Sequence, residues 1–446
     1  MLRILGNPAY ARLLSAQVVA LLGTGLLTVA LGLAAYDIAG AQAGAVLGIA
    51  LTIKMVAYVG LSPLATALVA RMDRRRVLIA ADLVRAGAAC CLPFIDAAWQ
   101  IYVLIFVLQS ASATFTPTFQ AVIPDILPEE EDYTRALSLS RLAYDLENLL
   151  SPVLAGLLLG VMASHWLFAG TGAGFLASAL LVGMTAIPAV SLRRDASFAD
   201  RLTRGTRIYL ATPRLRGLLA LNMAVAAVGA VVIVQSVVIV RAVYGLDERA
   251  LAVALAANGA GSMLAALALP RLLRDGGDRP VMLLAGGLAA AVMAGLGLVV
   301  AMAGWPAWPV FLGLWAVTGA ALAAILTPSG RLLRRSAHAE DRPAVFAAQF
   351  ALSHACWLVA YPAAGALGSG PGLAVAMLAA GGVAAAATIL AARIWPASLP
   401  DELEHNHDDL PPDHPHLADA ERRGGHLVHR HAFVIDDEHR VWPTAG

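Results

Sequence analysis

Histidine is concentrated at the C-terminal end of the chain. Eight of the eleven histidines lie beyond residue 400, and six of them form three H-x-H pairs. Neutral imidazole is a good ligand for Ni²⁺, Co²⁺, Zn²⁺ and Cu²⁺, and the absence of tail thiols argues against a dedicated Cu(I) site. We therefore expect the tail to bind a divalent transition metal through His405, His407, His414, His416, His426, His429, His431 and His439.

The rest of the tail determines how firmly these imidazoles are held. Residues 396–425 are rich in Asp, Glu, Pro and His, a composition that predicts disorder in the absence of metal. Over 429–435, His429, His431, Phe433 and Ile435 alternate with Arg430, Ala432 and Val434, and Asp436 and Asp437 offer a turn toward Trp442, which weakly indicates a small hairpin or edge strand. The irregular spacing of the histidines favours adaptable binding of modest affinity.

A second group of chemically capable residues lies inside an apolar segment. Arg141 and Asp145 share a helical face at a spacing of i to i+4, and Tyr144, Glu147 and Ser151 form an adjacent stripe. A charge deep in a bilayer costs at least about 2.5–3.5 kcal/mol, so such groups usually face a cavity or one another. The two carboxylates are candidates for coordinating a cation and exchanging it for protons. The alternative is an Arg141–Asp145 ion pair that only fixes the helix.

Two isolated basic groups extend this site. Lys54 lies near the middle of an apolar segment, too far from either end to reach water easily, and therefore needs a carboxylate or a wet cavity. His354 occupies the position of Tyr144 when the two halves of the chain are aligned on Pro152 and Pro362. An imidazole together with carboxylates is a plausible metal-binding set. The alternatives are a structural ion pair for the lysine and a hydrogen-bonded packing role for the histidine.

The elements that carry these residues must be membrane-spanning helices. The composition is 59% hydrophobic and 14% charged, with a mean hydropathy of +0.73, whereas soluble domains contain about 25% charged residues. Apolar windows of about 20 residues, long enough to span a bilayer, recur along the chain. The sequence predicts an all-α membrane protein with twelve helices, near 13–36, 43–69, 77–95, 100–122, 138–161, 166–190, 215–240, 249–270, 281–303, 308–328, 344–366 and 372–394.

The loops indicate orientation and domain organisation. Arginine is concentrated in alternate loops, near 71–76, 193–216, 271–279 and 331–342, which places both termini in the cytoplasm by the positive-inside rule. We expect the first apolar segment to be a retained span. Four regions are predicted in order: a six-helix bundle at 1–190, a cytoplasmic linker at 191–214, a second six-helix bundle at 215–395, and the tail at 396–446.

Smaller features favour structural roles. Asp82 and Arg85, three residues apart, are expected to form a structural ion pair. Glycine-rich patches such as "NGAGS" (258–262) are typical of close packing between membrane helices. The three cysteines lie in apolar stretches and imply no disulfide framework.

Two loop and helix motifs resemble the major facilitator superfamily. "ARMDRRRVL" (70–78) is similar to that family's loop between helices two and three, and "LLSPVLAG" (149–156) to the helix-five motif of its antiporters. The resemblance extends over about residues 1–395. It implies two bundles around a central cavity that opens alternately to either side, with helices two and eleven in contact, so Lys54 is expected near His354. The family's usual loop aspartate is replaced by Ala70, and Asp73 is a candidate substitute.

A narrower resemblance bears on the substrate. The run "SRLAYDLENLLSP" (140–152) and the histidine-rich tail are similar to nickel-resistance exporters. This resemblance implies proton-coupled efflux of nickel or cobalt across a bacterial inner membrane, with Asp145, Glu147, Arg141, Lys54 and His354 in transport and proton coupling. Two alternatives stay open. The fold equally serves exporters of hydrophobic drugs or siderophores, with the tail as a regulator, and the chain could instead be a metal sensor that no longer transports.

The remaining expectations concern chemistry and partners. No phosphate-cradling loop, nucleophile elbow or catalytic dyad is present in the sequence, so the chain is expected not to be an enzyme and to draw on an ion gradient. We expect no tightly bound cofactor, with Ni²⁺ or a similar ion as substrate or tail ligand. The expected partners are the lipid bilayer and a small-molecule or metal-ion substrate. The chain is expected to act as a monomer and not to bind nucleic acid.

Overall fold

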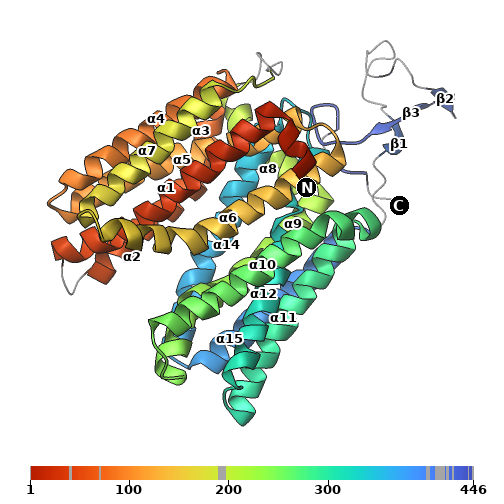
Figure 1. The fold of residues 1–446 in the computed structure, drawn as a ribbon. Helices are drawn as coiled ribbons and strands as arrows, with labels where there is room; N and C mark the ends of the chain where they lie inside the picture. The colour runs from red at the N-terminus through yellow and green to blue at the C-terminus, as the bar shows by residue number, and fades with distance from the viewer. Residues whose placement is uncertain are drawn as a thin grey trace.

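The structure of the protein is a computed structural model that is almost entirely helical apart from the tail (Figure 1). It describes residues 2–39, 43–69, 72–188, 197–397, 402–406, 417, 421–423, 426–439 and 441–443. Long apolar stretches form helices because a helix satisfies every backbone hydrogen bond within one segment, which a bilayer requires.

The N-terminal bundle consists of six long helical segments, one of which changes geometry midway. The segment after α1 begins as α2, passes through a π-helical turn, η3, and continues as α3. Short 3₁₀ turns lie at Leu2–Gly6 (η1), Leu92–Phe94 (η4) and Ser164–Trp166 (η5). The bounds are α1 (Pro8–Ala39), α2 (Ala43–Val56), η3 (Ala57–Leu61), α3 (Ser62–Val69), α4 (Arg74–Cys91), α5 (Ala98–Ile126), α6 (Glu130–Leu159) and α7 (Leu167–Gly183).

The C-terminal bundle follows an amphipathic helix, α8 (Phe198–Ala211), which lies in the segment predicted as a linker. The bundle itself comprises α9 (Pro213–Val238) with a π-helical turn η6 (Ile239–Val243), α10 (Glu248–Gly276), α11 (Asp278–Ala303), α12 (Trp308–Leu326) with the short α13 (Ser329–Arg335), α14 (Arg342–Ser369) and α15 (Leu373–Ile394).

Within the described residues, eleven helices are long and apolar enough to cross a membrane. They account for eleven of the twelve expected spans. The other expected span, 138–161, corresponds to α6, a 30-residue helix that is not among the eleven. The mostly helical architecture is confirmed, and the count of twelve stays a prediction.

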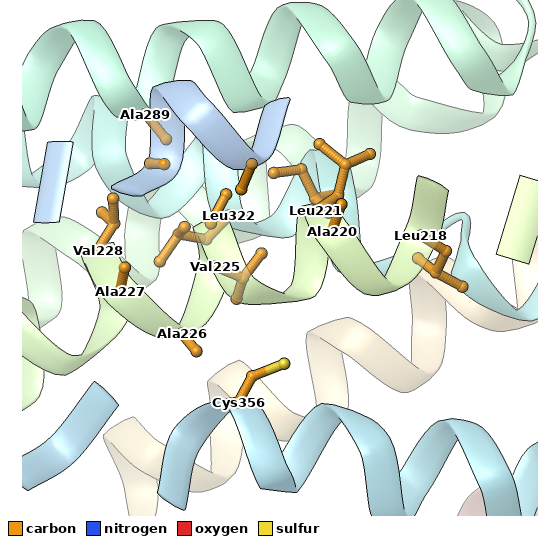
Figure 2. Close-up of a cluster of buried hydrophobic side chains, with 14 of the residues drawn as sticks. Leu218, Ala220, Leu221, Val225, Ala226, Ala227, Val228, Ala289, Leu322 and Cys356 are labelled. Carbon is orange, nitrogen blue, oxygen red and sulfur yellow. The ribbon is translucent and has the colours of Figure 1, made fainter. Parts of the chain in front are cut away.

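The C-terminal bundle has one continuous apolar interior. Leu221 and Val228 of α9 belong to the same apolar cluster as Ala289 of α11 and Leu322 of α12, and Cys356 of α14 approaches α9 from the opposite side (Figure 2). Glycines allow the closest helix contacts, as the sequence predicted for residues 258–262. A Cβ added at Gly261 would overlap the backbone of α12, so these two helices touch through their main chains.

The two bundles meet at one end of the molecule. Figure 1 shows them close together near the labelled termini and diverging toward the opposite end. Contacts between the bundles join α6 to α10, and α14 to α3 and α5. The end near the termini contains the start of α4, the junction of α5 and α6, α13 and the start of α14, and its ion pairs are rich in arginine. We call it the basic end.

The tail departs from the expected disorder where it is described. Strands β1 (Glu402–Asn406), β2 (Glu421–Arg423) and β3 (His426–Ala432) form an antiparallel sheet in the order β1-β3-β2, with His405 opposite His429. The alternating segment therefore does form a strand, although it begins earlier than predicted and pairs with two others. Backbone pairing stabilises this sheet even though its strands are polar. Much of 396–425 lies outside the described residues.

Candidate functional site

Lys54 and Glu147 are two charged side chains in the interior of the N-terminal bundle. Lys54 lies on α2 and Glu147 on α6, near enough for their opposite charges to interact. Gly25 of α1 makes room for the carboxylate, because a Cβ at this position would overlap the Ser151 side chain and lie 3.1 Å from Glu147 Oε1. The carboxylate whose charge acts on Lys54 therefore comes from α6, and direct pairing of the two groups stays a prediction.

Tyr58 connects this pair to the C-terminal bundle. Lys54 Nζ lies 5.6 Å from the centre of the Tyr58 ring, and Tyr58 donates a 2.7 Å hydrogen bond to Gln109 Oε1 on α5. The same ring contacts His354 of α14 edge-on, with centroids 4.8 Å apart. Tyr58 lies in η3, and a π-helical turn shifts the faces of the helices on either side of it. Sequence reasoning missed Tyr58, since nothing in the sequence marks such a turn.

His354 lies within an aromatic surface of α14. Its Nδ1 donates a 2.7 Å hydrogen bond to the carbonyl oxygen of Phe350, and the two rings are 4.2 Å apart. Two further aromatic residues, Trp357 and Tyr361, follow on α14, with ring centroids 5.0 Å apart. Lys54 and His354 lie close together as predicted, because both contact the Tyr58 ring. Hence the arrangement combines a carboxylate, an amine, an imidazole and several aromatic rings near the junction of the bundles.

Asp145 points to a different neighbour. Arg141 forms an ion pair with it at 3.0 Å, and the Arg141 guanidinium also donates 2.9 and 2.8 Å hydrogen bonds to Ser262 Oγ of α10. Asp145 is 4% exposed and therefore belongs to a buried contact between α6 and α10. The carboxylates of Asp145 and Glu147 have different partners, and His354 lies beside Lys54. The predicted grouping of Asp145, Glu147 and His354 around one cation is not assembled in this conformation.

The Asp82–Arg85 ion pair is buried as the sequence predicted. The guanidinium lies over two rings, 4.0 Å from the centroid of Phe115 and 4.5 Å from that of Phe175. Aromatic faces attract a cation, so α5 and α7 add to the stabilisation that Asp82 provides. This pair ties helices of the same bundle together.

The basic end carries a three-residue ion-pair cluster that bridges the bundles. Asp125, near the end of α5, pairs with Arg74 of α4 at 2.6 Å and with Arg342 of α14 at 2.5 Å. Arg74 also donates a 2.9 Å hydrogen bond to the carbonyl of Ala339. The suggested substitute, Asp73, has another role: it caps α4 by accepting from Arg76 N–H at 3.0 Å. Sequence reasoning missed Asp125 because its partners Arg74 and Arg342 lie 51 and 217 positions away in the sequence.

A second ion-pair cluster lies at the same end and also joins the two bundles. Arg331 of α13 pairs with Glu130 of α6 at 2.9 Å and with Asp278 of α11 at 3.3 Å. Arg335 reaches the same two acids at 3.0 and 3.4 Å. Two arginines here share two acids, whereas two arginines share one acid in the first cluster. Together the clusters hold the basic end closed.

The structure describes only part of the predicted metal-binding tail. Side chains are described for His431 and His439, whose rings are 5.0 Å apart. His439 Nδ1 lies 2.8 Å from Asp436 Oδ1. His405, His426 and His429 are placed by backbone only, and His407, His414 and His416 lie outside the described residues. Among the described residues there is no group of three His, Cys, Asp or Glu side chains that could hold a metal ion.

Comparison with known proteins relates this geometry to transport. A family model described as Major Facilitator Superfamily matches residues 13–302. Macrolide efflux protein A of Streptococcus pyogenes is 26% identical over 175 residues, covering 36% of this chain and 43% of that protein. The uncharacterised transporter YfiS of Bacillus subtilis is 27% identical over 122 residues, covering 27% of this chain and 29% of that protein. The matched stretch thus spans less than half the length of these curated relatives.

Solved structures share the fold at low sequence identity. The human organic anion transporter MFSD10 superposes with a TM-score of 0.70 at 11% identity, covering 86% of this chain and 99% of that one. A bacterial homologue of the iron transporter ferroportin in an outward-facing state gives a TM-score of 0.70 at 14% identity, covering 87% and 98%. These similarities establish the architecture alone.

Proposed function

The chain belongs to the Major Facilitator Superfamily, and from that premise we propose that it is an ion-gradient-driven exporter of a small molecule. The proposed location is a bacterial inner membrane, with the basic end in the cytoplasm as the arginine-rich loops favour. In that orientation the closed basic end corresponds to an outward-facing state.

The observation that carries the proposal is that Lys54 of α2 lies near enough to Glu147 of α6 for their charges to interact, while the Tyr58 ring lies next to both Lys54 and His354 of the opposite bundle. A charge in the membrane interior is costly unless it is paired, so the charge state of each partner controls the other. A proton bound by Glu147 removes the charge that Lys54 faces. In the proposed cycle Glu147 takes up a proton from outside, the bundles rock about their interface, and the proton leaves on the cytoplasmic side as substrate enters.

The surroundings of this pair favour a hydrophobic organic substrate. Tyr58 of the N-terminal bundle and Phe350 of α14 place aromatic rings on the two sides of the bundle junction, with ring centroids 4.7 Å apart. Small-molecule sites are usually lined by apolar and aromatic side chains with a few polar groups that fix orientation. The similarity to macrolide efflux proteins supports the same substrate class.

Export of a divalent metal ion is the second candidate. The eight tail histidines are the feature that favours it, because a cytosolic cluster of imidazoles would collect Ni²⁺ or Co²⁺ near the entrance. The separate partners of Asp145 and Glu147 count against a membrane site for a metal ion in this conformation. Under the first candidate, the tail would act as a metal-responsive regulator.

The deciding experiment measures transport by the purified protein in proteoliposomes with an imposed pH gradient. Parallel assays follow a radiolabelled macrolide, Ni²⁺ by an enclosed indicator, and luminal pH. Macrolide movement that is coupled to proton flux and lost in Glu147→Gln supports the first candidate. Ni²⁺ movement with the same dependence supports the second. Absence of proton-coupled movement of either solute, with correctly inserted protein, would contradict the proposal.

A further inference from the structure

The end of the tail folds back onto the transporter. Residues 433–439 together with Val441 and Trp442, here called the strap, form a turn in which Asp436 N–H donates to the carbonyl of His439 at 3.1 Å. The turn returns Trp442 to within 5.0 Å of Phe433, measured between ring centroids. This is the turn predicted at the aspartate pair, and it creates a compact apolar plug at the end of a polar tail.

The strap is buried against the C-terminal bundle. Phe433, Ile435 and Trp442 are 4%, 1% and 8% exposed and join the apolar cluster formed by the bundle helices. Arg214, at the start of α9, lies over the Trp442 ring at 5.5 Å. Removing large apolar side chains from water is favourable, so these contacts hold the strap in place.

Charged contacts fix the strap to two neighbouring elements. Arg204 of α8 donates to Asp437 Oδ1 at 2.9 Å and to the Asp341 carboxylate at 2.5 and 3.0 Å. His338 Nε2 lies 3.4 Å from Asp436 Oδ2. Burial by itself would raise the pKa of Asp436, but hydrogen bonds from His338 and His439 outweigh it and lower that pKa well below its ordinary value. Asp436 therefore faces these histidines as a carboxylate.

The loop that receives the strap also closes the basic end. Within the segment 336–342, His338 contacts the strap directly and Asp341 does so through Arg204, while Ala339 and Arg342 bind Arg74 and Asp125 of the N-terminal bundle. Neighbouring positions of one short loop therefore take part in two different interactions, the docking of the strap and the contact between the bundles. Displacement of the strap would free this loop on one side.

Helix α8 gives the strap a second route to the same interface. It contacts α3 of the N-terminal bundle as well as α14. Its backbone lies directly on α14, because a Cβ at Gly205 would overlap the backbone of Ala344. By holding Arg204, the strap fixes a helix that touches both bundles where they must separate for the basic end to open.

We propose that the strap is an intramolecular latch that stabilises the conformation closed at the basic end, and that its release increases the population open at this end. The proposal does not depend on the identity of the substrate. A docked segment shifts a conformational equilibrium only by the difference in its affinity for the two states. We expect release to raise the ratio of open to closed molecules about tenfold, within the usual range of such coupling.

The experiment uses the full chain with a protease recognition sequence inserted after Ala397. Spin labels are attached at Arg75→Cys and Arg271→Cys, exposed positions at the basic end of each bundle, after Cys90, Cys91 and Cys356 have been replaced by alanine. Co-elution of the tail with the bundles after cleavage measures docking. The distribution of distances between the labels measures closure.

Trp442→Ala is the release variant, and Val441→Ala is the matched control because Val441 is 78% exposed. The cleaved tail should co-elute in the parent and in Val441→Ala, and should be lost in Trp442→Ala with a shift to longer distances. If Trp442→Ala does not accumulate in the membrane, Asp437→Asn serves as a second release variant. It weakens the contact of the strap with Arg204 and leaves the buried apolar side chains unchanged. Equal tail retention in parent and release variants would overturn the docking, and tail loss with unchanged distances would overturn the latch.

Discussion

The interiors of the two bundles differ in kind. The C-terminal bundle encloses one continuous apolar cluster, whereas the apolar residues of the N-terminal bundle fall into three separate clusters. Charged groups occupy the N-terminal interior: the Asp82–Arg85 pair, the Lys54–Glu147 pair and Asp145. In the described helices of the C-terminal bundle, the polar groups buried at comparable depth are mainly neutral, such as Asn222, Gln235 and Ser236.

This difference indicates a division of labour. A buried charge has a high free-energy cost. Because such charges are concentrated in the N-terminal bundle, a change of protonation there alters the conformational free energy most. A uniformly apolar, closely packed bundle moves more readily as a rigid body, since its packing has no charge state to adjust. The C-terminal bundle nevertheless contributes His354 and the aromatic surface of α14 to the junction. Four predictions test this contrast.

The largest effect on stability is expected for the buried ion pair of the N-terminal bundle. Asp82→Leu leaves the Arg85 guanidinium buried without its carboxylate and should cost about 3–5 kcal/mol of unfolding free energy. The double variant Asp82→Leu/Arg85→Leu should recover most of that loss, because an apolar replacement needs no partner. Reversible unfolding in mixed micelles measures both. If the single and double variants lose the same unfolding free energy, the uncompensated charge of Arg85 is not the cause of the destabilisation.

The next effect concerns transport. Glu147→Gln keeps the shape of the side chain and removes its exchangeable proton, so gradient-driven transport in proteoliposomes should fall at least about 100-fold, or about 2.7 kcal/mol. Asp145→Asn is the comparison, because that carboxylate is already engaged by Arg141 and, through Arg141, Ser262. We expect it to retain measurable transport. A larger loss of transport in Asp145→Asn than in Glu147→Gln would indicate that the proton-coupling carboxylate of α6 is Asp145, which faces α10, and not Glu147.

Lys54 should show a smaller, charge-dependent effect. Lys54→Ala removes the cation that faces Glu147, and its transport rate should fall about tenfold, which corresponds to about 1.4 kcal/mol. Lys54→Arg keeps the charge and should retain most of the activity. The rates are compared at equal amounts of protein in the membrane. Indistinguishable rates in all three forms would make the lysine incidental.

The smallest effect is expected in the C-terminal bundle. Ser236 Oγ accepts a 2.9 Å hydrogen bond from Trp315 Nε1, a contact between α9 and α12. Ser236→Ala should cost about 0.6 kcal/mol of stability, the average for such bonds between membrane helices, and should leave transport unchanged. A severe loss of transport with normal stability would show that neutral polar groups of this bundle take part in the cycle.

Much of this architecture could be predicted because hydropathy is a local property. Apolar runs of sufficient length located eleven of the helices, and residue spacing identified the Arg141–Asp145 and Asp82–Arg85 pairs. Spacing along a helix fixes which neighbours on that helix meet. The alignment of the halves placed His354 at the bundle junction for the same reason, since equivalent positions in a repeat lie at similar depth.

The features that were missed depend on contacts between distant segments. Tyr58 reaches His354 only because a π-helical turn redirects it, and Asp125 became a bridging residue only once Arg74 and Arg342 were placed on either side. The direction in which Asp145 points was likewise decided by Ser262, 117 positions away in the numbering. A single sequence gives residue types at such contacts but not the rotation of one helix against another.

The ion pairs between the bundles at the basic end have a consequence for the speed of closure. Among the described residues, the N-terminal bundle contributes the acids of these pairs, Asp125, Glu130 and Glu131, and the C-terminal bundle contributes the arginines. Two such faces attract each other across water over a Debye length of about 8 Å at physiological ionic strength. Closing should therefore be steered by long-range attraction and should slow as salt is added, whereas the rate of opening should be governed mainly by the short-range contacts that must break.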